Sequence, residues 1–175
     1  DDQKAAQDRI SWSATHDALT QLPNRRLFDT QLAKGLAAAE AAGEGLALFV
    51  LDVDHFKHIN DTMGHDAGDA VLRTLADRLR GIVRPRDTVA RLGGDEFALI
   101  LPGVGTGEEA AMISERLLDR LREPVSHGGA MLDCRASIGA SRYPVNGETA
   151  TELIAAAEFP VIDTSCLGLL HLARS

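Results

Sequence analysis

The chain has few cysteines, few basic residues and no long apolar run, and each shortage excludes a class of protein. Cys134 and Cys166 are too few for a disulfide framework and lack the spacing of metal ligands, so we expect a protein of the reducing cytoplasm. No apolar run approaches the ~18 residues of a membrane span, and no signal-peptide pattern opens the sequence. Asp and Glu outnumber Lys and Arg, and the net charge of −8 argues against nucleic acid or an anionic membrane as the main partner.

The remaining composition is that of an ordinary globular domain. The chain has 175 residues, 45% of them hydrophobic and 25% charged, which suffices for one domain with a buried core and some flanking sequence. It begins at Asp1 rather than at a methionine, so we expect a piece of a longer protein. The acidic balance leaves a nucleotide partner open, because a bound metal ion can neutralise a triphosphate.

Helical and strand-like patterns alternate along the chain. Residues 1–16 are polar and helix-compatible, and we interpret them as a connector that enters the domain. Continuous apolar character predicts a buried strand at residues 46–53, and a second strand is expected at residues 131–143, after a turn at Gly128 and Gly129. Apolar spacing or capping residues predict four helices: one over 27–36 that ends at Gly43, one over 71–83, one from Thr106 to about Glu123, and one that begins at Thr149. This alternation predicts an α/β or α+β fold in which helices pack on a sheet.

The most unusual segment reads Gly93-Gly94-Asp95-Glu96-Phe97 and lies between two apolar runs. Two-residue hairpin turns need positive φ angles, which glycine adopts at little cost, so the segment predicts a tight β-hairpin. The carboxylates of Asp95 and Glu96 contribute nothing to such a turn by themselves. They belong either to a solvated turn or to a chemical site, and the segment alone does not decide between the two.

A second acidic segment follows the predicted buried strand. Asp52 and Asp54 lie at its carboxyl end, where α/β sheets often bind ligands. An EF-hand is excluded, because Phe56 and Lys57 stand where that loop needs Asp or Asn and then Gly. A dinucleotide-binding glycine motif is excluded at residues 103–107, because the third glycine is misplaced.

The two acidic segments could meet in space. If the strand that ends at Asp52 and the hairpin that carries Asp95 are neighbours in one sheet, their carboxylates can converge. Oxygen ligands with open positions suit Mg²⁺, and Lys57 could reach a phosphate as a point charge. His55 and His58 could also ligate a metal, although solvated surface histidines are the commoner outcome.

Together these segments resemble the GGDEF domain of diguanylate cyclases. Besides the hairpin, the resemblance rests on four segments: DALTQLPNRR at 17–26, DVDHFKHIND at 52–61, GHDAGD at 64–69 and SIGA at 137–140. It covers residues 17–158, in order and at the family's spacings. It implies a nucleotidyl-cyclase or palm-like fold, with a central, mostly antiparallel sheet of about five strands flanked by helices.

The resemblance implies a reaction. In the family, two GTP molecules, each held by one domain of a homodimer, are joined into cyclic di-GMP with release of pyrophosphate. Asp52, the Val53 carbonyl and Asp95 would hold Mg²⁺ or Mn²⁺, and either Glu96 or Asp95 would help to deprotonate the attacking 3′-hydroxyl. Lys57 would stabilise charge that develops on the phosphate.

The resemblance also assigns residues to nucleotide recognition. Asn60 and Asp69 would read guanine, since a carboxylate can accept from its N1–H and its 2-amino group together. Phe56, Gly93 and Gly94 would line the substrate. The structural alternatives are that Asn60 closes a turn and that Asp69 caps the following helix.

Arg84 and Asp87 match the Arg-x-x-Asp pattern of the family's inhibitory site, where cyclic di-GMP binds and holds the domains apart. Arginine suits phosphate and stacks on guanine, and aspartate suits the hydrogen-bonding edge of guanine. The alternative is a solvated turn in which Arg86 and Asp87 pair at the surface.

Residues 159–175 depart from the family pattern. The family continues with a Lys and an Arg that contact the phosphates, whereas this chain has Pro160 and only His171 and Arg174 as cations. We interpret this segment as an atypical tail, a non-native one being one explanation, and expect weakened GTP binding.

We therefore predict a cytoplasmic diguanylate cyclase domain, attached in the full-length protein to an upstream sensor region, without nucleic-acid or membrane contact. The main alternative is a catalytically impaired domain that binds GTP or cyclic di-GMP as a receptor. A pure dimerisation module is a third possibility, which the retained Asn60 and Asp69 make hard to sustain.

Overall fold

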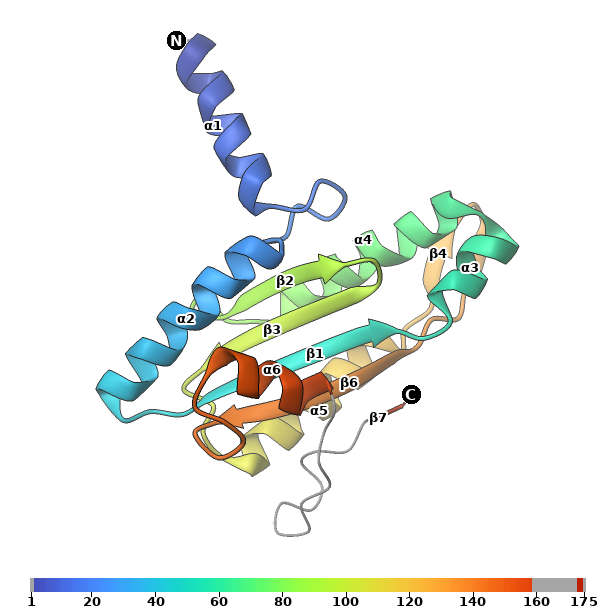
Figure 1. Cartoon of the computed structure of the whole chain (residues 1–175). Coiled ribbons are helices and arrows are strands. Elements are labelled where there is room, and N and C mark those ends of the chain that lie inside the picture. The colour runs from blue at the N-terminus through green and yellow to red at the C-terminus, as the bar shows by residue number, and fades with distance from the viewer. Residues whose placement is uncertain (1, 159–172, 175) are drawn as a thin grey trace.

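The computed structural model describes residues 2–158 and 173–174 of the chain. Its centre is a sheet with the strand order β2-β3-β1-β6-β7, in which every neighbouring pair is antiparallel (Figure 1). The strands are β1 (Leu46–Val53), β2 (Thr88–Gly93), β3 (Glu96–Pro102), β6 (Ala136–Tyr143) and the two-residue β7 (Ala173–Arg174). The expected mixed fold with a mostly antiparallel central sheet is confirmed.

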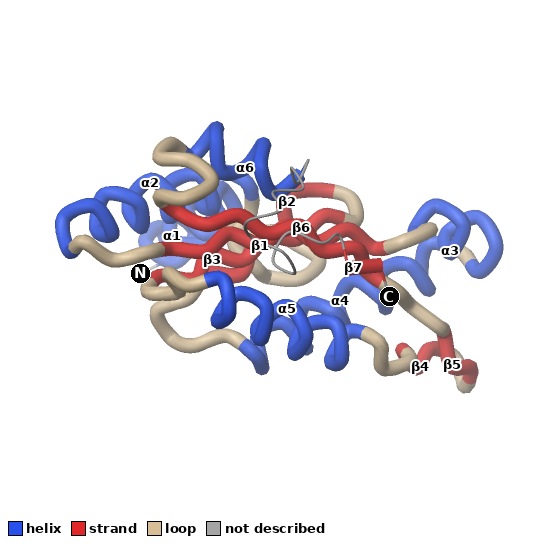
Figure 2. The backbone as a smooth tube through the Cα atoms, turned by 90° about the horizontal axis from the view of Figure 1, so that it is seen from below, coloured by secondary structure: helices blue, strands red, loops and turns tan. Residues whose placement is uncertain are grey.

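Helices cover both faces of this sheet. α2 (Arg25–Ala42) and α6 (Ala150–Glu158) pack on one face, and α4 (His65–Ile82) and α5 (Gly107–Leu121) pack on the other (Figure 2). The central strand β1 is apolar at nearly every position because its side chains alternate between the two layers. Phe49 belongs to the α4–α5 layer and Leu48 to the α2–α6 layer, and both are fully buried.

The connector is a helix that extends from the domain. α1 (Asp2–Thr15) has no buried residue and points away from the sheet (Figure 1). Asn24 holds the C-terminal end of α1 through two hydrogen bonds. The backbone N–H of Asn24 donates to the Thr15 carbonyl at 2.9 Å, and its side-chain amide donates to the Ala14 carbonyl at 3.0 Å. The Asn24 side-chain oxygen also accepts from the Leu27 N–H at 3.1 Å and so caps α2.

Several predicted helix ends agree with the structure. Gly43 ends α2 in the left-handed conformation with a φ of 66°. The hydroxyl oxygens of Thr106 and Thr149 accept from the backbone N–H groups of Glu109 and Glu152, each at 3.2 Å, at the starts of α5 and α6. These local signals were sufficient because each cap is made within one turn of its helix.

Two segments differ from the prediction. Residues 131–143 do not form one strand: the hairpin of β4 (Val125–His127) and β5 (Ala130–Leu132) ends first, and β6 follows after a break. β5 pairs with β4 whereas β6 pairs with β1, so the chain moves from one sheet to another between them. Residues 56–63 form a helix, α3 (Phe56–Met63), and Asn60 therefore lies within a helix rather than in the turn considered for it.

Most of the predicted atypical tail, including Pro160 and His171, lies outside the described residues. β7 pairs with Ser137 and Ile138 of β6 at one edge of the sheet. None of the helices in the described part of the chain has the length and apolar character needed to cross a bilayer.

Candidate active site

The end of β1 brings the two acidic segments together. Asp52 lies opposite Glu96 of β3 on one side and opposite Ser137 of β6 on the other. Asp52 and Glu96 share the face covered by α2 and α6, since Val50, two positions earlier in β1, belongs to that layer. They line a hollow of about 310 Å³ whose other walls come from β6 and α6, with Ser137, Gly139, Ala157 and Glu158 among the lining residues.

The glycine–acid hairpin joins β2 to β3 through Gly94 and Asp95. Gly93 and Gly94 have φ angles of 151° and 47°, and no atom lies within 4 Å of the position that a Cβ would take at either residue. The strand pairing shifts just before Gly93, so the turn falls one residue later than a turn made by the two glycines. The Val53 N–H donates to the Asp95 carbonyl at 3.1 Å, which places Asp95 beside the end of β1.

Burial and neighbouring carboxylates raise the pKa of two acidic groups at this site, Glu96 and Asp52. Burial, followed by the charges of Asp52 and Glu158, raises the pKa of Glu96 to about 7. A hydrogen bond with Glu158 adds to that shift, and Arg25 at the start of α2 opposes it. The pKa of Asp52 is also raised, first by burial and then by the charge of Asp95. Both shifts favour the neutral acid, so a cation that binds here competes with protons.

The donor set fits a hard divalent cation that keeps open positions. Asp52 and Asp95 offer carboxylate oxygens, and Val53 offers a backbone carbonyl at the end of β1. Within the described ranges, no three His, Cys, Asp or Glu side chains are arranged to hold a metal ion. Mg²⁺ suits such an incomplete set, because it binds through one or two carboxylates together with substrate phosphates. Asp54 is engaged elsewhere, since its Oδ1 accepts from Ser137 Oγ at 2.6 Å.

α3 and α4 hold the residues expected to bind the nucleotide. Lys57 is exposed in the first turn of α3, and Asn60 lies one turn later. The Asn60 side-chain oxygen lies against the backbone of Gly68 in α4, so closely that a Cβ at Gly68 would overlap it, and the Phe56 ring packs at the same place. Asp69 follows Gly68 inside α4 rather than before its first turn, so it does not cap that helix.

Arg84 and Asp87 form a pair in the loop between α4 and β2. The Arg84 guanidinium donates to both carboxylate oxygens, with distances of 3.1 Å from Nε to Oδ2 and 2.9 Å from Nη2 to Oδ1. It also donates to the Pro102 carbonyl at 2.7 Å. The side chain of Asp87 is 3% exposed and that of Arg84 is 49% exposed. Arg86, the alternative partner of Asp87, pairs with Glu44 instead, at 3.4 Å.

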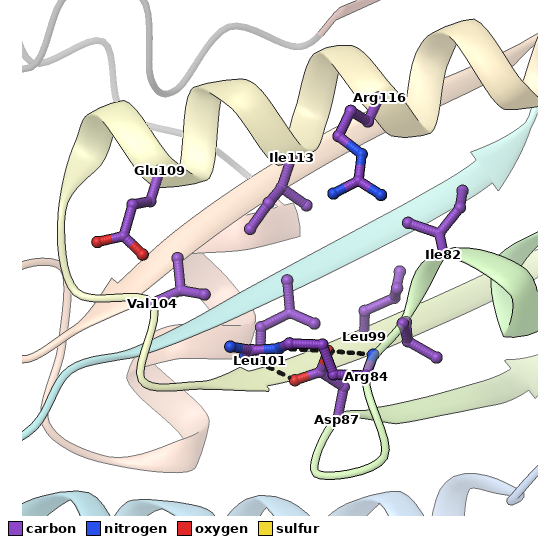
Figure 3. A pocket seen from close by; sticks show the side chains of 10 residues that line it. Ile82, Arg84, Asp87, Leu99, Leu101, Val104, Glu109, Ile113 and Arg116 are labelled. Atoms are coloured by element: carbon purple, nitrogen blue, oxygen red, sulfur yellow. Dashed lines mark hydrogen bonds and ion pairs between the residues drawn. The ribbon is translucent and has the colours of Figure 1, made fainter.

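This pair borders an apolar pocket of about 190 Å³ between α4, β3 and α5 (Figure 3). The walls are aliphatic side chains: Ile82, Val83, Leu99, Leu101, Val104 and Ile113. Arg116 of α5 lies across the pocket from Arg84, and Glu109 lies nearer the start of α5 (Figure 3). The sequence did not single out Arg116, because it lies in an ordinary amphipathic helix and belongs to no motif.

Three more residues at the site were missed from the sequence. Arg91 donates to the Gly94 carbonyl, with 2.7 Å from Nη2 to the oxygen, and its place just before the glycines was a usable signal. Arg25 and Glu158 stand at the ends of α2 and α6, and only the packing of those helices on the sheet brings them to Glu96.

Comparison with known proteins identifies the family of the chain. A family model described as diguanylate cyclase, GGDEF domain, matches residues 14–161. The chain belongs to the GGDEF domain family. The matched stretch of this GGDEF domain contains both acidic segments, the hairpin, and the α3–α4 contact at Asn60 and Gly68.

Solved GGDEF structures share its fold. The GGDEF domain of TpbB, also called YfiN, from Pseudomonas aeruginosa has a TM-score of 0.79 at 40% identity, over 82% of this chain and 84% of that one. A sensory box/GGDEF family protein from Caulobacter crescentus has a TM-score of 0.78 at 43% identity, over 82% and 93%. DgcB from Caulobacter crescentus, solved with cyclic di-GMP, has a TM-score of 0.78 at 31% identity, over 89% and 82%.

The curated relatives are longer than this chain. Diguanylate cyclase TpbB of Pseudomonas aeruginosa is 40% identical over 146 residues, which are 83% of this chain and 34% of the relative. Cyclic di-GMP phosphodiesterase NbdA of the same species is 39% identical over 155 residues, which are 89% of this chain and 20% of the relative. This GGDEF domain thus spans about a third or less of these relatives, whose names describe the whole proteins.

Proposed function

We propose that this GGDEF domain is the catalytic domain of a diguanylate cyclase, which condenses two GTP molecules into cyclic di-GMP and pyrophosphate. The observation that carries the proposal is the convergence of Asp52, Asp95 and Glu96 at one end of β1. These carboxyl groups come from two separate segments, and the pKa values of Asp52 and Glu96 are raised by burial and by neighbouring carboxylates, which a purely structural turn would not require. The relative TpbB, named a diguanylate cyclase, supports the same activity.

Asp52, Asp95 and the Val53 carbonyl would hold Mg²⁺ or Mn²⁺. When bound, the ion neutralises triphosphate charge and orients the α-phosphate for attack. Two neighbouring carboxylates at the end of β1 repel each other without a cation, which fits the raised pKa of Asp52. Lys57, exposed at the start of α3, would contribute a mobile positive charge to the phosphates.

We assign Glu96 as the general base that accepts the proton of the 3′-hydroxyl group of GTP. Its pKa of about 7 in the metal-free site suits a general base near neutral pH. Asp95 lies in the turn and is assigned to the metal, whereas Glu96 begins β3 and faces the hollow beside Asp52. On this assignment the two neighbouring carboxylates have different tasks, a choice that the sequence left open.

Asn60 and Asp69 would read guanine. The contact between Asn60 and Gly68 holds the amide where α3 meets the first turns of α4, and Asp69 follows Gly68 in that helix. A carboxylate at this place can accept from the N1–H and the 2-amino group of guanine, a pair that adenine lacks. Phe56, Gly93 and Gly94 would border the substrate, and the open space around both glycines supports a close approach.

The condensation needs two domains, because each domain holds one nucleotide and supplies half of the reaction centre. We therefore propose a homodimer as the catalytic state. α1, which has no buried residue, would connect this domain to an upstream sensor region in the full-length protein. The greater length of the curated relatives supports such an arrangement.

Arg84 and Asp87 would form an inhibitory site for cyclic di-GMP. Their pair lines a largely apolar pocket, with Arg116 across it from Arg84 (Figure 3). Two guanidinium groups near an apolar surface suit a ligand that combines phosphates with flat bases. Binding of cyclic di-GMP at this site would then lower the activity of the domain as the product accumulates.

The second candidate function is a receptor that binds GTP or cyclic di-GMP without turnover. A relative named as a phosphodiesterase, NbdA, contains a stretch 39% identical to this chain, which favours keeping this candidate. In a receptor the carboxylates would be retained for ligand binding alone.

Incubation with GTP and MgCl₂, followed by chromatography of the nucleotides, separates the two functions. The matched control is Asp95→Asn, which keeps the size of the side chain and removes its charge. Cyclic di-GMP from the wild type but not from the variant supports the cyclase. Absence of product at protein concentrations that give a dimer, together with cyclic di-GMP binding measured by calorimetry, supports the receptor and contradicts the cyclase.

A further inference from the structure

The short helix α3 lies beyond the end of β1 (Figure 1). It has eight residues and none of them is buried, although Phe56 and Ile59 pack partly against the core. A helix of this length is not stable by itself, so its position depends on its contacts with the rest of the domain. That position matters for the proposed site, because α3 carries Lys57 and Asn60, whereas the proposed metal ligands lie at the end of β1.

Two parts of the domain hold α3 in place. On the side of α4, the Asn60 side-chain oxygen lies against Gly68. On the side of the sheet, Asp54, which follows β1, is bound to the start of β6 by two hydrogen bonds. The Asp54 N–H donates to the Arg135 carbonyl at 2.8 Å, and its Oδ1 accepts from Ser137 Oγ at 2.6 Å. The position of α3 relative to β1 therefore depends on β6 as well as on α4.

The turn between β1 and α3 has an unfavourable backbone conformation. His55 has a φ of 56° and a ψ of 31°, in the left-handed region that residues with a Cβ seldom adopt. Such a conformation costs about 1–3 kcal/mol and persists where neighbouring contacts determine it. The two hydrogen bonds of Asp54 are made directly before this residue. The bond from Ser137 joins a hydroxyl to a carboxylate, which is one of the stronger kinds of hydrogen bond.

Ser137 connects the two parts of the proposed site. Its backbone lies opposite Asp52 in the pairing of β6 with β1, and its hydroxyl holds Asp54. We propose that Ser137 is a positioning residue, which sets the place of α3, and with it Lys57 and Asn60, relative to the metal ligands at the end of β1. The inference rests on the proposed function of the site. Ser137 itself contacts no reacting atom in this role.

Amide hydrogen exchange of the metal-free, nucleotide-free protein is the first test. In Ser137→Ala, the N–H groups of Asp54 and of Ile59, in the first turns of α3, should exchange roughly tenfold faster, because the contact that holds the turn is lost. Ser137→Thr keeps the hydroxyl and should exchange at a rate close to that of the wild type. Unchanged exchange in Ser137→Ala would overturn the positioning role.

Ser141→Ala is the matched control for the exchange experiment. Ser141 lies in the same strand, and its Oγ donates to the Leu153 carbonyl of α6 at 2.8 Å, so this variant loses a buried hydrogen bond away from α3. It should lower the melting temperature and leave the exchange at Asp54 unchanged. An equal increase in Ser137→Ala and Ser141→Ala would contradict the proposal, because it would show a general loss of stability. Thermal melting of every variant confirms folding.

Steady-state kinetics of the dimeric protein with GTP and MgCl₂ form the second test. Ser137→Ala should lower kcat/KM for GTP by roughly tenfold, because α3 no longer presents Lys57 correctly to the phosphates. Ser137→Thr should stay within about threefold of the wild type, and an equal loss in both variants would refute the proposal. An inactive wild type with the expected change in exchange would refute the proposed function and leave the placement of α3 by Ser137 standing. An active cyclase with unchanged exchange would refute the positioning role alone.

Discussion

Asp17 and Arg91 form an ion pair that joins the start of the domain to the glycine–acid hairpin. Arg91 Nη1 lies 2.9 Å from Asp17 Oδ1, and the same guanidinium donates to the Gly94 carbonyl from Nε at 3.0 Å and from Nη2 at 2.7 Å. The N–H and hydroxyl groups of Thr20 donate to Asp17 Oδ2 at 2.9 and 2.7 Å. The chain that enters from α1 is thereby held against the turn that carries Asp95.

Removing this pair should destabilise the domain. The side chains of Arg91 and Asp17 are only 15% and 20% exposed, so we expect Asp17→Asn to lower the free energy of unfolding by about 1–3 kcal/mol. Arg91→Lys should cost a similar amount, because one ammonium cannot span Asp17 and the Gly94 carbonyl in this geometry. Urea unfolding measures both, and the double variant should be less destabilised than the sum of the two. Strict additivity would show that the two residues do not act as a pair.

The same pair predicts an acid-dependent loss of stability. Burial alone would raise the pKa of Asp17, but the hydrogen bonds from Thr20 and the ion pair with Arg91 bring it below its ordinary value of 3.8. The resulting stabilisation is present above that ordinary value and is lost as the pH falls through the lower folded value. Urea midpoints measured from pH 5 downward should therefore fall more steeply in the wild type than in Asp17→Asn. Parallel curves would contradict the shift.

Glu96 predicts the opposite dependence in the metal-free protein. Its ordinary pKa is 4.5 and its folded pKa is about 7, so between these values the unfolded chain releases a proton that the folded domain retains. Stability should therefore decrease as the pH rises from about 4.5 to about 7. With a chelator present, the drop in the urea midpoint between pH 5 and pH 8 should be smaller in Glu96→Gln than in the wild type. Glu40→Gln, at an exposed position of α2, is the control and should retain the full drop.

Much of this site could be predicted because its signals are local. The glycine pair predicts the hairpin, and the continuous apolar run predicts the strand β1. A strand that is apolar on both faces is covered by a layer on each side, so it belongs in the centre of the sheet. The convergence of Asp52 and Asp95 followed from one further assumption, that the strand and the hairpin are neighbours, and β1 does pair with β3.

The missed residues depend on packing between distant elements. Glu158 and Arg25 reach Glu96 only because α2 and α6 cover the same face of the sheet, and no spacing within either helix reports that. The break before β6 was missed for a related reason. The sequence pattern over residues 131–143 is that of one continuous strand, and only the pairing of β5 with β4 in the structure separates its first part from β6. A local pattern indicates which residues are strand-like, and the partner strand decides where each strand ends.

Gly139 should tolerate no side chain, even a methyl group. A Cβ there meets the backbone carbonyl of Ala157, which cannot swing away as a flexible side chain would. We expect Gly139→Ala to lower the free energy of unfolding by about 1–3 kcal/mol, as overpacking does elsewhere. Gly81→Ala is the matched control: it lies in α4 with nothing near its Cβ position, and it should raise stability by about 0.5–1 kcal/mol. A neutral or stabilising Gly139→Ala would show that α6 is not pressed against β6.

Asp69 should set the preference for guanine. Inosine triphosphate keeps N1–H but lacks the 2-amino group, so wild-type kcat/KM should favour GTP over ITP. Asp69→Asn replaces a two-site acceptor with a mixed donor and acceptor, and kcat/KM for GTP should fall by the equivalent of about 1.5–3 kcal/mol. The ratio of GTP to ITP activity should shrink at the same time. A uniform loss with both nucleotides would assign Asp69 to structure rather than to base recognition.

Arg84 should control inhibition by cyclic di-GMP, and a neighbouring arginine provides the control. Arg84 lines the pocket with Arg116, whereas Arg86 pairs with Glu44 and does not line it. For each variant, the rate with added cyclic di-GMP is divided by its own rate without it. The concentration that halves the rate should rise roughly tenfold or more in Arg84→Ala, because a charge-assisted contact is lost, less in Arg116→Ala, and not at all in Arg86→Ala. Equal effects of Arg84→Ala and Arg86→Ala would indicate that surface charge, not the pocket, determines inhibition.

Asp87→Asn tests whether Asp87 acts only by orienting Arg84. If it does, this variant should weaken inhibition less than Arg84→Ala, because its amide oxygen can still accept from the guanidinium.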